Sequence, residues 1–162
     1  MNAVARPKGW QESSLGKIAT IERKTVQPEK IQAGTVYLGL EHITSEGQFT
    51  QIEAVEAGEL ASNKFVFSER HVLYGKLRPY LKKIARRNFL FYYLRKPKFI
   101  ELATARSTGA NLPRLSPKDL AEFPVVFPAI AEQRRIAEIL DRADAVRRKR
   151  QAAIVLTEEL LR

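Results

Sequence analysis

The sequence has no cysteine among its 162 residues and only two histidines, His42 and His71. Without cysteine the chain can form neither a disulfide nor a thiolate metal site, and it has no cysteine nucleophile. Two isolated histidines make a histidine-rich metal centre hard to build. No apolar run approaches the roughly 18 residues of a membrane-spanning helix, and the N-terminus lacks the apolar stretch of a secretory signal. We therefore expect a cytoplasmic protein that binds neither metal nor membrane.

The sequence also lacks the motifs of common active sites. It contains no glycine-rich phosphate loop, no Gly-x-Gly-x-x-Gly turn and no Gly-x-Ser-x-Gly elbow. His42 and His71 have no second histidine at ligand spacing, which is typical of surface or hydrogen-bonded strand histidines. Glu53, Glu56 and Glu59 fall in a loop-like stretch without an apolar pocket and indicate a solvated face. The chain is therefore predicted not to be an enzyme on its own.

Acidic residues are absent from residues 70–98, which hold ten of the 28 lysines and arginines. Those ten equal the net charge of +10, so the rest of the chain is neutral as a whole. A pI near 10.0 favours a polyanionic partner, either nucleic acid or an anionic membrane surface. The membrane surface fits less well because the basic segment is not an amphipathic helix.

Residues 10–130 predict an α+β domain with a mixed sheet and many short elements. Glu46-Gly47 supplies a turn, Asn88 precedes a helical pattern, and Pro97 interrupts or restarts that helix. Ser116 followed by Pro117 is a second helix start. Alternating or apolar segments predict strands at residues 35–44, 49–54, 64–67, 71–74 and 125–127, with 80–84 also extended.

The C-terminal region, residues 131–162, contains neither glycine nor proline and predicts one helix of about 48 Å. Such a helix is too long to bury its apolar stripe on so small a domain, so we expect it to pair with a helix of a second chain or of a missing remainder of this one. The alternative is a helix folded back on its own domain. Arg150 and Thr157 weaken the stripe. Its other members form the predicted dimer or subunit interface: Ile136, Ile139, Ala143, Val146, Ala153 and Leu160.

Residues 72–83 combine basic side chains with Tyr74 and Tyr80, and Gly75 and Pro79 supply turns that could present them together. Lysine and arginine contact phosphates, arginine grips guanine edges, and tyrosine stacks on bases. The alternative is a solvated basic strand whose tyrosines belong to the core, and for the tyrosines core packing is slightly favoured. The candidate DNA-binding residues of this region are Tyr74, Lys76, Arg78, Tyr80, Lys82, Lys83 and Arg86.

A second candidate is the polar loop at residues 107–114. Gly109 permits close approach, while Asn111 and Arg114 are able to read bases or phosphates. An ordinary helix-to-helix connection, with Asn111 bonded to backbone groups, is an equally good interpretation of this loop alone.

Five segments occur in an order that resembles the specificity subunit of type I restriction–modification systems. The resemblance covers nearly the whole chain. It is carried by Gly9-Trp10 with residues 15–18, by Tyr-Leu-Gly-Leu-Glu-His-Ile at 37–43, by Leu-Tyr-Gly-Lys-Leu-Arg-Pro-Tyr-Leu at 73–81, by Gly-Ala-Asn-Leu-Pro-Arg-Leu-Ser at 109–116, and by Phe123-Pro124 through Ala-Glu-Gln-Arg-Arg-Ile-Ala-Glu-Ile-Leu at 131–140.

The resemblance implies a non-catalytic DNA-binding role. Such subunits carry two target recognition domains joined by two long antiparallel helices, and each domain reads half of a split site. This chain resembles one recognition domain (residues 1–128) and one dimerisation or spacer helix (residues 129–162), and a homodimer would read a symmetric split site. The resemblance further implies modification (methyltransferase) and restriction subunits as partners. S-adenosylmethionine, ATP and Mg²⁺ are expected on those partners, with no cofactor on this chain.

The sequence departs from the family pattern after residues 78–81, Arg-Pro-Tyr-Leu. A further stretch with strands usually follows, whereas here Lys83 is almost directly followed by Asn88. Either the chain is shortened or a segment is missing from the sequence. A real shortening would favour an alternative function, an assembly module that docks modification subunits without reading DNA. An RNA-binding regulator is another alternative, because aromatic side chains on a basic sheet suit single strands.

Overall fold

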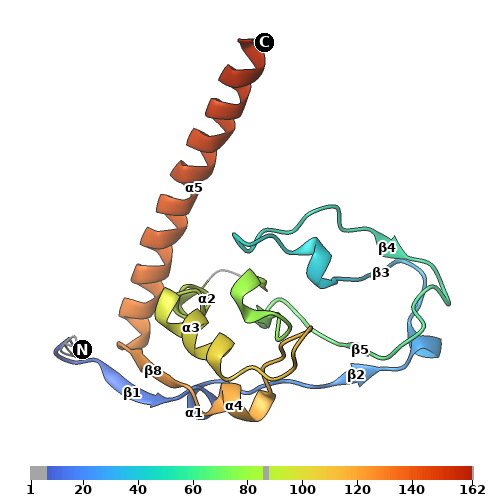
Figure 1. Cartoon of the computed structure of the whole chain (residues 1–162), viewed down its shortest axis with the longest axis horizontal. Coiled ribbons are helices and arrows are strands. Elements are labelled where there is room, and N and C mark those ends of the chain that lie inside the picture. Colours follow the sequence, from blue (N-terminus) through green and yellow to red (C-terminus); the bar gives the residue numbers. More distant parts are fainter. Residues whose placement is uncertain (1–6, 86–87, 162) are drawn as a thin grey trace.

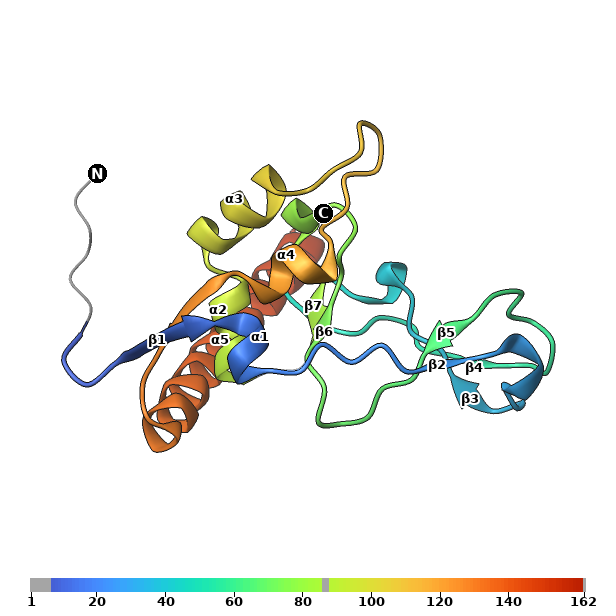
Figure 2. The ribbon, with the colours of Figure 1, turned by 90° about the horizontal axis from the view of Figure 1, so that it is seen from below.

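The computed structural model describes residues 7–85 and 88–161. A body of two lobes stands beside the base of one long helix, α5 (Ile130–Leu160) (Figure 1). The helical lobe holds β1, α1 to α4 and β8, and the strand lobe holds β2 to β5, which lie at the other end of the body in both ribbon views (Figure 2). Small sheets, short helices and one long C-terminal helix confirm the predicted α+β class.

Two helices of the body, α2 and α4, begin at residues whose side chains cap them. In α2 (Phe89–Leu94) the Asn88 side chain accepts a hydrogen bond from the Phe91 amide at 2.8 Å. In α4 (Pro117–Ala121) the Ser116 hydroxyl accepts from the Asp119 amide at 3.0 Å, and Pro117 takes the first turn, where no N–H is needed. Between them α3 (Pro97–Ala105) also begins at a proline, which is the predicted restart.

The start and the end of the body are joined by the longest sheet pairing. Strand β1 (Gln11–Ser14) runs antiparallel to β8 (Pro124–Phe127), and α1 (Leu15–Ile18) follows β1 directly. Side chains of α1 to α4 and β8 pack together in one core, in which the centres of the Phe99 and Phe123 rings are 5.1 Å apart. Burying an aromatic side chain of this size contributes about 2–3 kcal/mol, so this core holds the helical lobe together. Its fully buried members include Phe91, Phe123, Ile84, Leu115 and Val125.

The strand lobe is built from much shorter pairings. Strand β2 (Thr25–Val26) pairs with β5 (Lys64–Phe65), and β3 (Thr35–Val36) pairs with β4 (Ala54–Val55), all antiparallel. Hairpin β6 (Leu73–Tyr74) to β7 (Ile84–Ala85) lies between the lobes (Figure 2). Two-residue pairings bury few side chains, and apolar groups of this lobe remain exposed to solvent: Val36, Phe65, Val66 and Phe67.

Two predicted strands are wrong as continuous elements, for local reasons. The segment 35–44 pairs at Thr35–Val36 and again where Ile43 bridges to Phe49, but between these points Leu40–His42 forms a turn of 3₁₀ helix in which the His42 Nδ1 accepts from the Gly39 amide at 3.2 Å. The segment 80–84 is likewise interrupted by a 3₁₀ turn, Pro79–Leu81. Proline favours that turn by fixing φ, and strand alternation alone does not reveal it. The remaining short 3₁₀ helix is Pro28–Lys30.

Candidate nucleic-acid interface

The hairpin formed by residues 73–85 presents most of the predicted DNA-binding side chains. Its base is closed by the Gly75 amide, which donates to the Lys83 carbonyl at 2.7 Å. A side chain at Gly75 would lie 2.8 Å from Leu40 and 2.9 Å from Lys83, so only glycine fits there without rearrangement. At the tip, Arg78 (φ 46°) and Lys82 (φ 54°) adopt the left-handed conformation on either side of the 3₁₀ turn. This strained tip projects Tyr80, which is 46% exposed.

The second predicted segment, residues 107–114, and the adjoining Leu115 lie directly against this hairpin; together they are called loop 107–115. The Arg78 amide donates to the Pro113 carbonyl at 2.8 Å, and the Leu115 amide donates to the Lys76 carbonyl at 3.0 Å. The Arg78 guanidinium also reaches the Asn111 carbonyl at 3.4 Å. Two loops more than 30 residues apart in sequence therefore form one surface. The exposed predicted residues on it are Arg78, Tyr80, Lys82, Asn111 and Arg114, with Lys76 half-buried.

Lys83 and Tyr74 serve the fold more than the surface. The Lys83 ammonium donates to the Ile43 carbonyl, which ties the hairpin to the strand lobe. The Tyr74 ring packs edge-on against Phe99 at 6.4 Å, and its buried hydroxyl has no hydrogen-bond partner in the described residues. Burial raises the pKa of Tyr74 to about 12. Its position favours core packing over DNA contact, whereas the predicted Arg86 lies outside the described residues.

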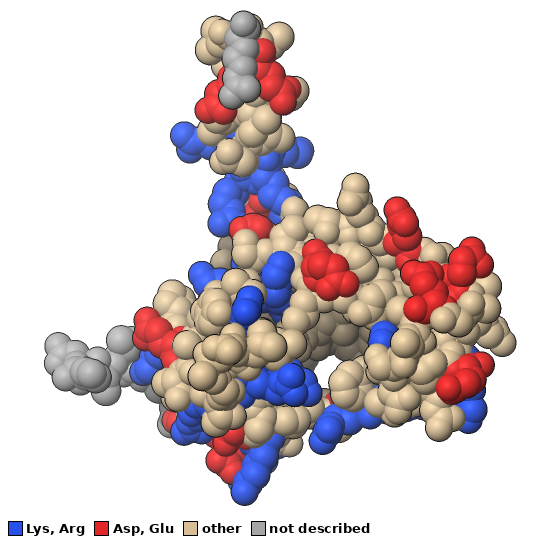
Figure 3. Space-filling model, turned by 45° about the vertical axis from the view of Figure 1, so that its right-hand side comes forward, with Lys and Arg blue, Asp and Glu red and all other residues tan. Residues whose placement is uncertain are grey.

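Other cations of residues 70–98 are also used inside the fold. Arg95 donates to the Ser45 carbonyl at 2.5 Å and lies 5.0 Å from the centre of the Phe91 ring. Lys96 lies 4.4 Å from the Tyr93 ring centre, and partial burial lowers the pKa of Lys96. On the face in Figure 3, Lys and Arg are spread over the helical lobe and along the lower edge of the body, while Asp and Glu gather on the strand lobe. On this face the cations do not form one continuous patch.

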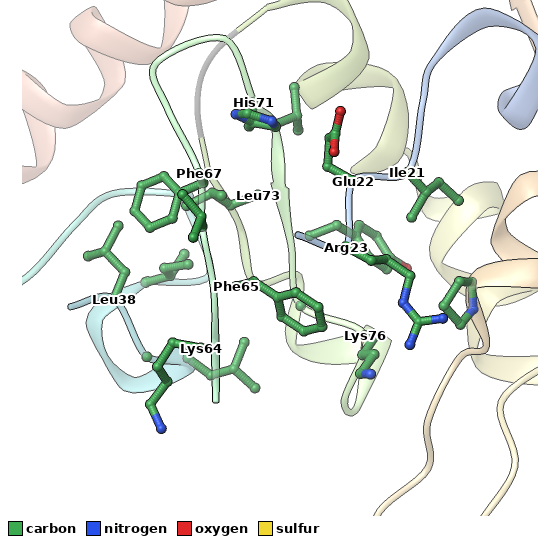
Figure 4. Close-up of a pocket in the computed structure, with 18 of the residues that line it drawn as sticks. Ile21, Glu22, Arg23, Leu38, Lys64, Phe65, Phe67, His71, Leu73 and Lys76 are labelled. Atoms are coloured by element: carbon green, nitrogen blue, oxygen red, sulfur yellow. The ribbon is translucent and has the colours of Figure 1, made fainter. Parts of the chain in front are cut away.

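A cavity of about 990 Å³ separates the two lobes and is lined mainly by apolar side chains. Phe65, Phe67 and Leu73 line it, together with Arg23 and Lys76 (Figure 4). This cavity is not predictable from the sequence, because it forms where separate two-residue pairings leave the strand lobe incompletely packed. No periodic signal in the sequence reports such a gap.

Helix α5 contacts the body along a stripe of its own. The Tyr92 hydroxyl of α2 donates to Asp141 at 2.7 Å and lies 3.5 Å from Asp144, and Ala137 is the buried residue of α5. Positions 137, 141 and 144 repeat in steps of four and three, on a different face from the predicted dimer seam. The seam is mostly open: Ile139 is 54%, Val146 67% and Leu160 87% exposed, Ala143 and Ala153 are exposed, and Ile136 is half-buried.

Residues 7–155 match the family described as the type I restriction modification DNA specificity domain. The chain belongs to this family. A curated relative, the type I restriction enzyme EcoDI specificity subunit of Escherichia coli, is 25% identical over 178 residues, which cover 95% of this chain and 40% of that protein. The alignment is longer than this chain, so the relative has residues without a counterpart here. Their location between Lys83 and Asn88 stays a prediction.

Solved structures share the fold of this specificity domain. The HsdS subunit from Thermoanaerobacter tengcongensis superposes with a TM-score of 0.71 at 23% identity, covering 96% of this chain and 48% of that one. A structure described as the basis of complex assembly and conformational transition of the type I R-M system gives 0.72 at 24% identity, covering 93% and 47%. The chain thus spans about half the length of these relatives.

Two kinds of site are not found in the part of the specificity domain that the structure describes. Its residues contain no group of three or more His, Cys, Asp or Glu side chains able to hold a metal ion. None of its helices is both long and apolar enough to cross a membrane.

Proposed function

We propose that this chain is the DNA-reading half of a type I specificity subunit, which directs modification and restriction subunits to a split duplex target. The observation that carries the proposal is the joining of hairpin 73–85 to loop 107–115 on a DNA specificity domain. Phosphate contacts position a protein on DNA, and base contacts specify the sequence. The exposed Lys82 suits the first task, while Arg78, Asn111 and Arg114 suit the second.

Pairing of two chains through α5 would complete the arrangement. The exposed seam residues Ile139 and Val146 lie on a face that the body leaves free. Two such helices packed together would hold two recognition bodies at a fixed distance from each other. The two bodies would then read a symmetric split site. The chain itself would bind no cofactor; S-adenosylmethionine, ATP and Mg²⁺ would belong to the partner subunits. Changing Ile139 and Val146 to lysine should yield a monomer by light scattering, and an unchanged mass would contradict this seam.

The central test is selection from a randomised duplex library by the full chain, followed by mobility shifts at increasing salt. We expect one preferred duplex whose affinity falls steeply with salt, because lysine and arginine release counterions from phosphates. The same shifts are measured with the modification subunit present. Loss of every sequence preference, with the modification subunit still bound, would favour the assembly module. A preference for single-stranded RNA would favour the RNA-binding regulator.

A further inference from the structure

The middle of α5 carries four consecutive cations, Arg147, Arg148, Lys149 and Arg150, which we call the α5 basic band. Successive helical residues are rotated by about 100°, so four of them point all around the helix. Acids are absent from residues 145–157, although Glu158 and Glu159 follow. Figure 3 shows this basic zone on α5 above the body, with acidic groups nearer the free end.

Packing within the chain does not account for the α5 basic band. Arg147 lies 3.4 Å from Asp144, but the arginine side chain is 63% exposed, and exposed pairs of this kind contribute at most about 1 kcal/mol. Lys149 and Arg150 are exposed and form no ion pair in the described residues. One guanidinium nitrogen of Arg148 is buried without a hydrogen-bond partner there.

Pairing of α5 with another helix does not account for the band either. Arg150 occupies a position of the predicted seam, where a charged side chain weakens the packing of two helices. The other three cations lie off that position and around the rest of the helix. The exposed Arg147, Lys149 and Arg150 point in different directions around the helix and are suited to phosphates, whose negative charges follow a helical path around the duplex.

We propose that the α5 basic band contacts the phosphates of duplex DNA between the two half-sites, without reading sequence. This inference rests on the proposed function, in which α5 separates two recognition bodies. The 31 residues of α5 span about 46 Å, or about 14 base pairs of DNA. DNA held by both bodies must pass along that distance. Three of the four cations are arginines, which are also enriched in protein interfaces, so binding of the modification subunit is measured beside binding of DNA.

The test compares two duplexes bound by the full chain. The first duplex carries a single half-site from the library selection. The second adds about 15 base pairs of unrelated sequence to one side of that half-site, and the two possible sides are tested as separate duplexes. The double variant R147Q/K149Q leaves the seam residues unchanged, and R134Q/R135Q removes the same charge from the first turns of α5 as the matched control. Light scattering verifies that each variant keeps the wild-type mass. The measurement is the slope of log affinity against log salt.

We expect the wild type to show a steeper salt slope on one extended duplex than on the half-site. In R147Q/K149Q the slope on that extended duplex should fall by about two, close to one for each lost phosphate contact. The half-site slope should stay unchanged, and R134Q/R135Q should retain the extra slope of the extended duplex.

Equal wild-type slopes on both duplexes would overturn the inference while leaving half-site recognition, and thus the proposed function, intact. Unchanged DNA slopes in R147Q/K149Q with weakened binding of the modification subunit would assign the band to a protein partner and overturn it as well. Absence of any preferred duplex for the wild type would instead remove the proposed function and the inference together.

Discussion

The helical lobe and α5 are held in place in opposite ways. The helical lobe encloses aromatic and aliphatic side chains, with Phe91 and Phe123 fully buried. Along α5, Ala137 is the buried residue, and Tyr92 supplies a polar contact to the body. A core that is buried within one chain is stable by itself, whereas an exposed apolar seam gains stability only from a partner. The lobe is thus suited to hold a reading surface, and the helix is suited to assembly.

The largest expected effect comes from breaking the core of the lobe. Phe123→Ala removes a fully buried ring that contacts Phe99, and such truncations cost about 3–5 kcal/mol. Chemical denaturation of the full chain measures the change. Leu156→Ala on α5 is the control, since that side chain is 60% exposed and should shift stability by less than about 0.5 kcal/mol. Similar losses in both variants would mean that α5 is as deeply packed as the lobe.

The parts predicted from sequence are those decided by local chemistry. Ser116 and Pro117 start α4 as predicted, and α2 begins near Asn88 as predicted, because helix starts need only neighbouring residues. The absence of glycine and proline gives the long helix. The hairpin tip could not be foreseen, because the left-handed Arg78 is held by the carbonyl of Pro113, far along the chain.

The candidate site also depends on contacts between segments that are far apart in the sequence. Sequence selects residues 72–83 and 107–114 as candidates but treats them as two separate loops. Their contact depends on backbone hydrogen bonds between Lys76 and Leu115, which no periodicity encodes. The number of lysines and arginines in the sequence also overstates the positive charge on the surface, because Lys83 and Arg95 donate hydrogen bonds to carbonyls of the strand lobe.

A second prediction separates base reading from general charge. Arg78→Ala removes a guanidinium fixed beside loop 107–115 and should weaken binding to the selected duplex by about 1–3 kcal/mol, with relaxed specificity at one position. Lys98→Ala is the matched control, because Lys98 is exposed and comes from the same acid-free segment but lies on α3. Competition mobility shifts with base-substituted duplexes measure the affinity and the base preference of both variants. Equal losses would show that Arg78 contributes charge alone.

A third prediction concerns the junction between the lobe and α5. Tyr92→Phe removes the donor to Asp141 and leaves a half-buried carboxylate with one partner fewer, which should cost about 1–2 kcal/mol. Because α5 is about 46 Å long, a tilt of about 10° at its base moves the free end by about 8 Å. Small-angle X-ray scattering should therefore show a broader distribution of long distances. Tyr80→Phe is the control, since that exposed ring lies on the hairpin tip; an identical scattering change there would refute a specific role for Tyr92.

The smallest effect is expected at Tyr74, beneath the reading surface. Its hydroxyl is buried without a partner in the described residues, so Tyr74→Phe should be neutral or stabilise the fold by up to about 1 kcal/mol at neutral pH. Burial raises the pKa of Tyr74 from 10.0 to about 12, so the folded state holds the proton more tightly than the unfolded state. The resulting stability is complete below pH 10 and is lost as the pH rises from 10 towards 12. Denaturation of wild type and Tyr74→Phe across that range should show a smaller alkaline loss in the variant. Parallel curves would place the Tyr74 hydroxyl in solvent, and Tyr74 would then belong with Tyr80 on the candidate surface.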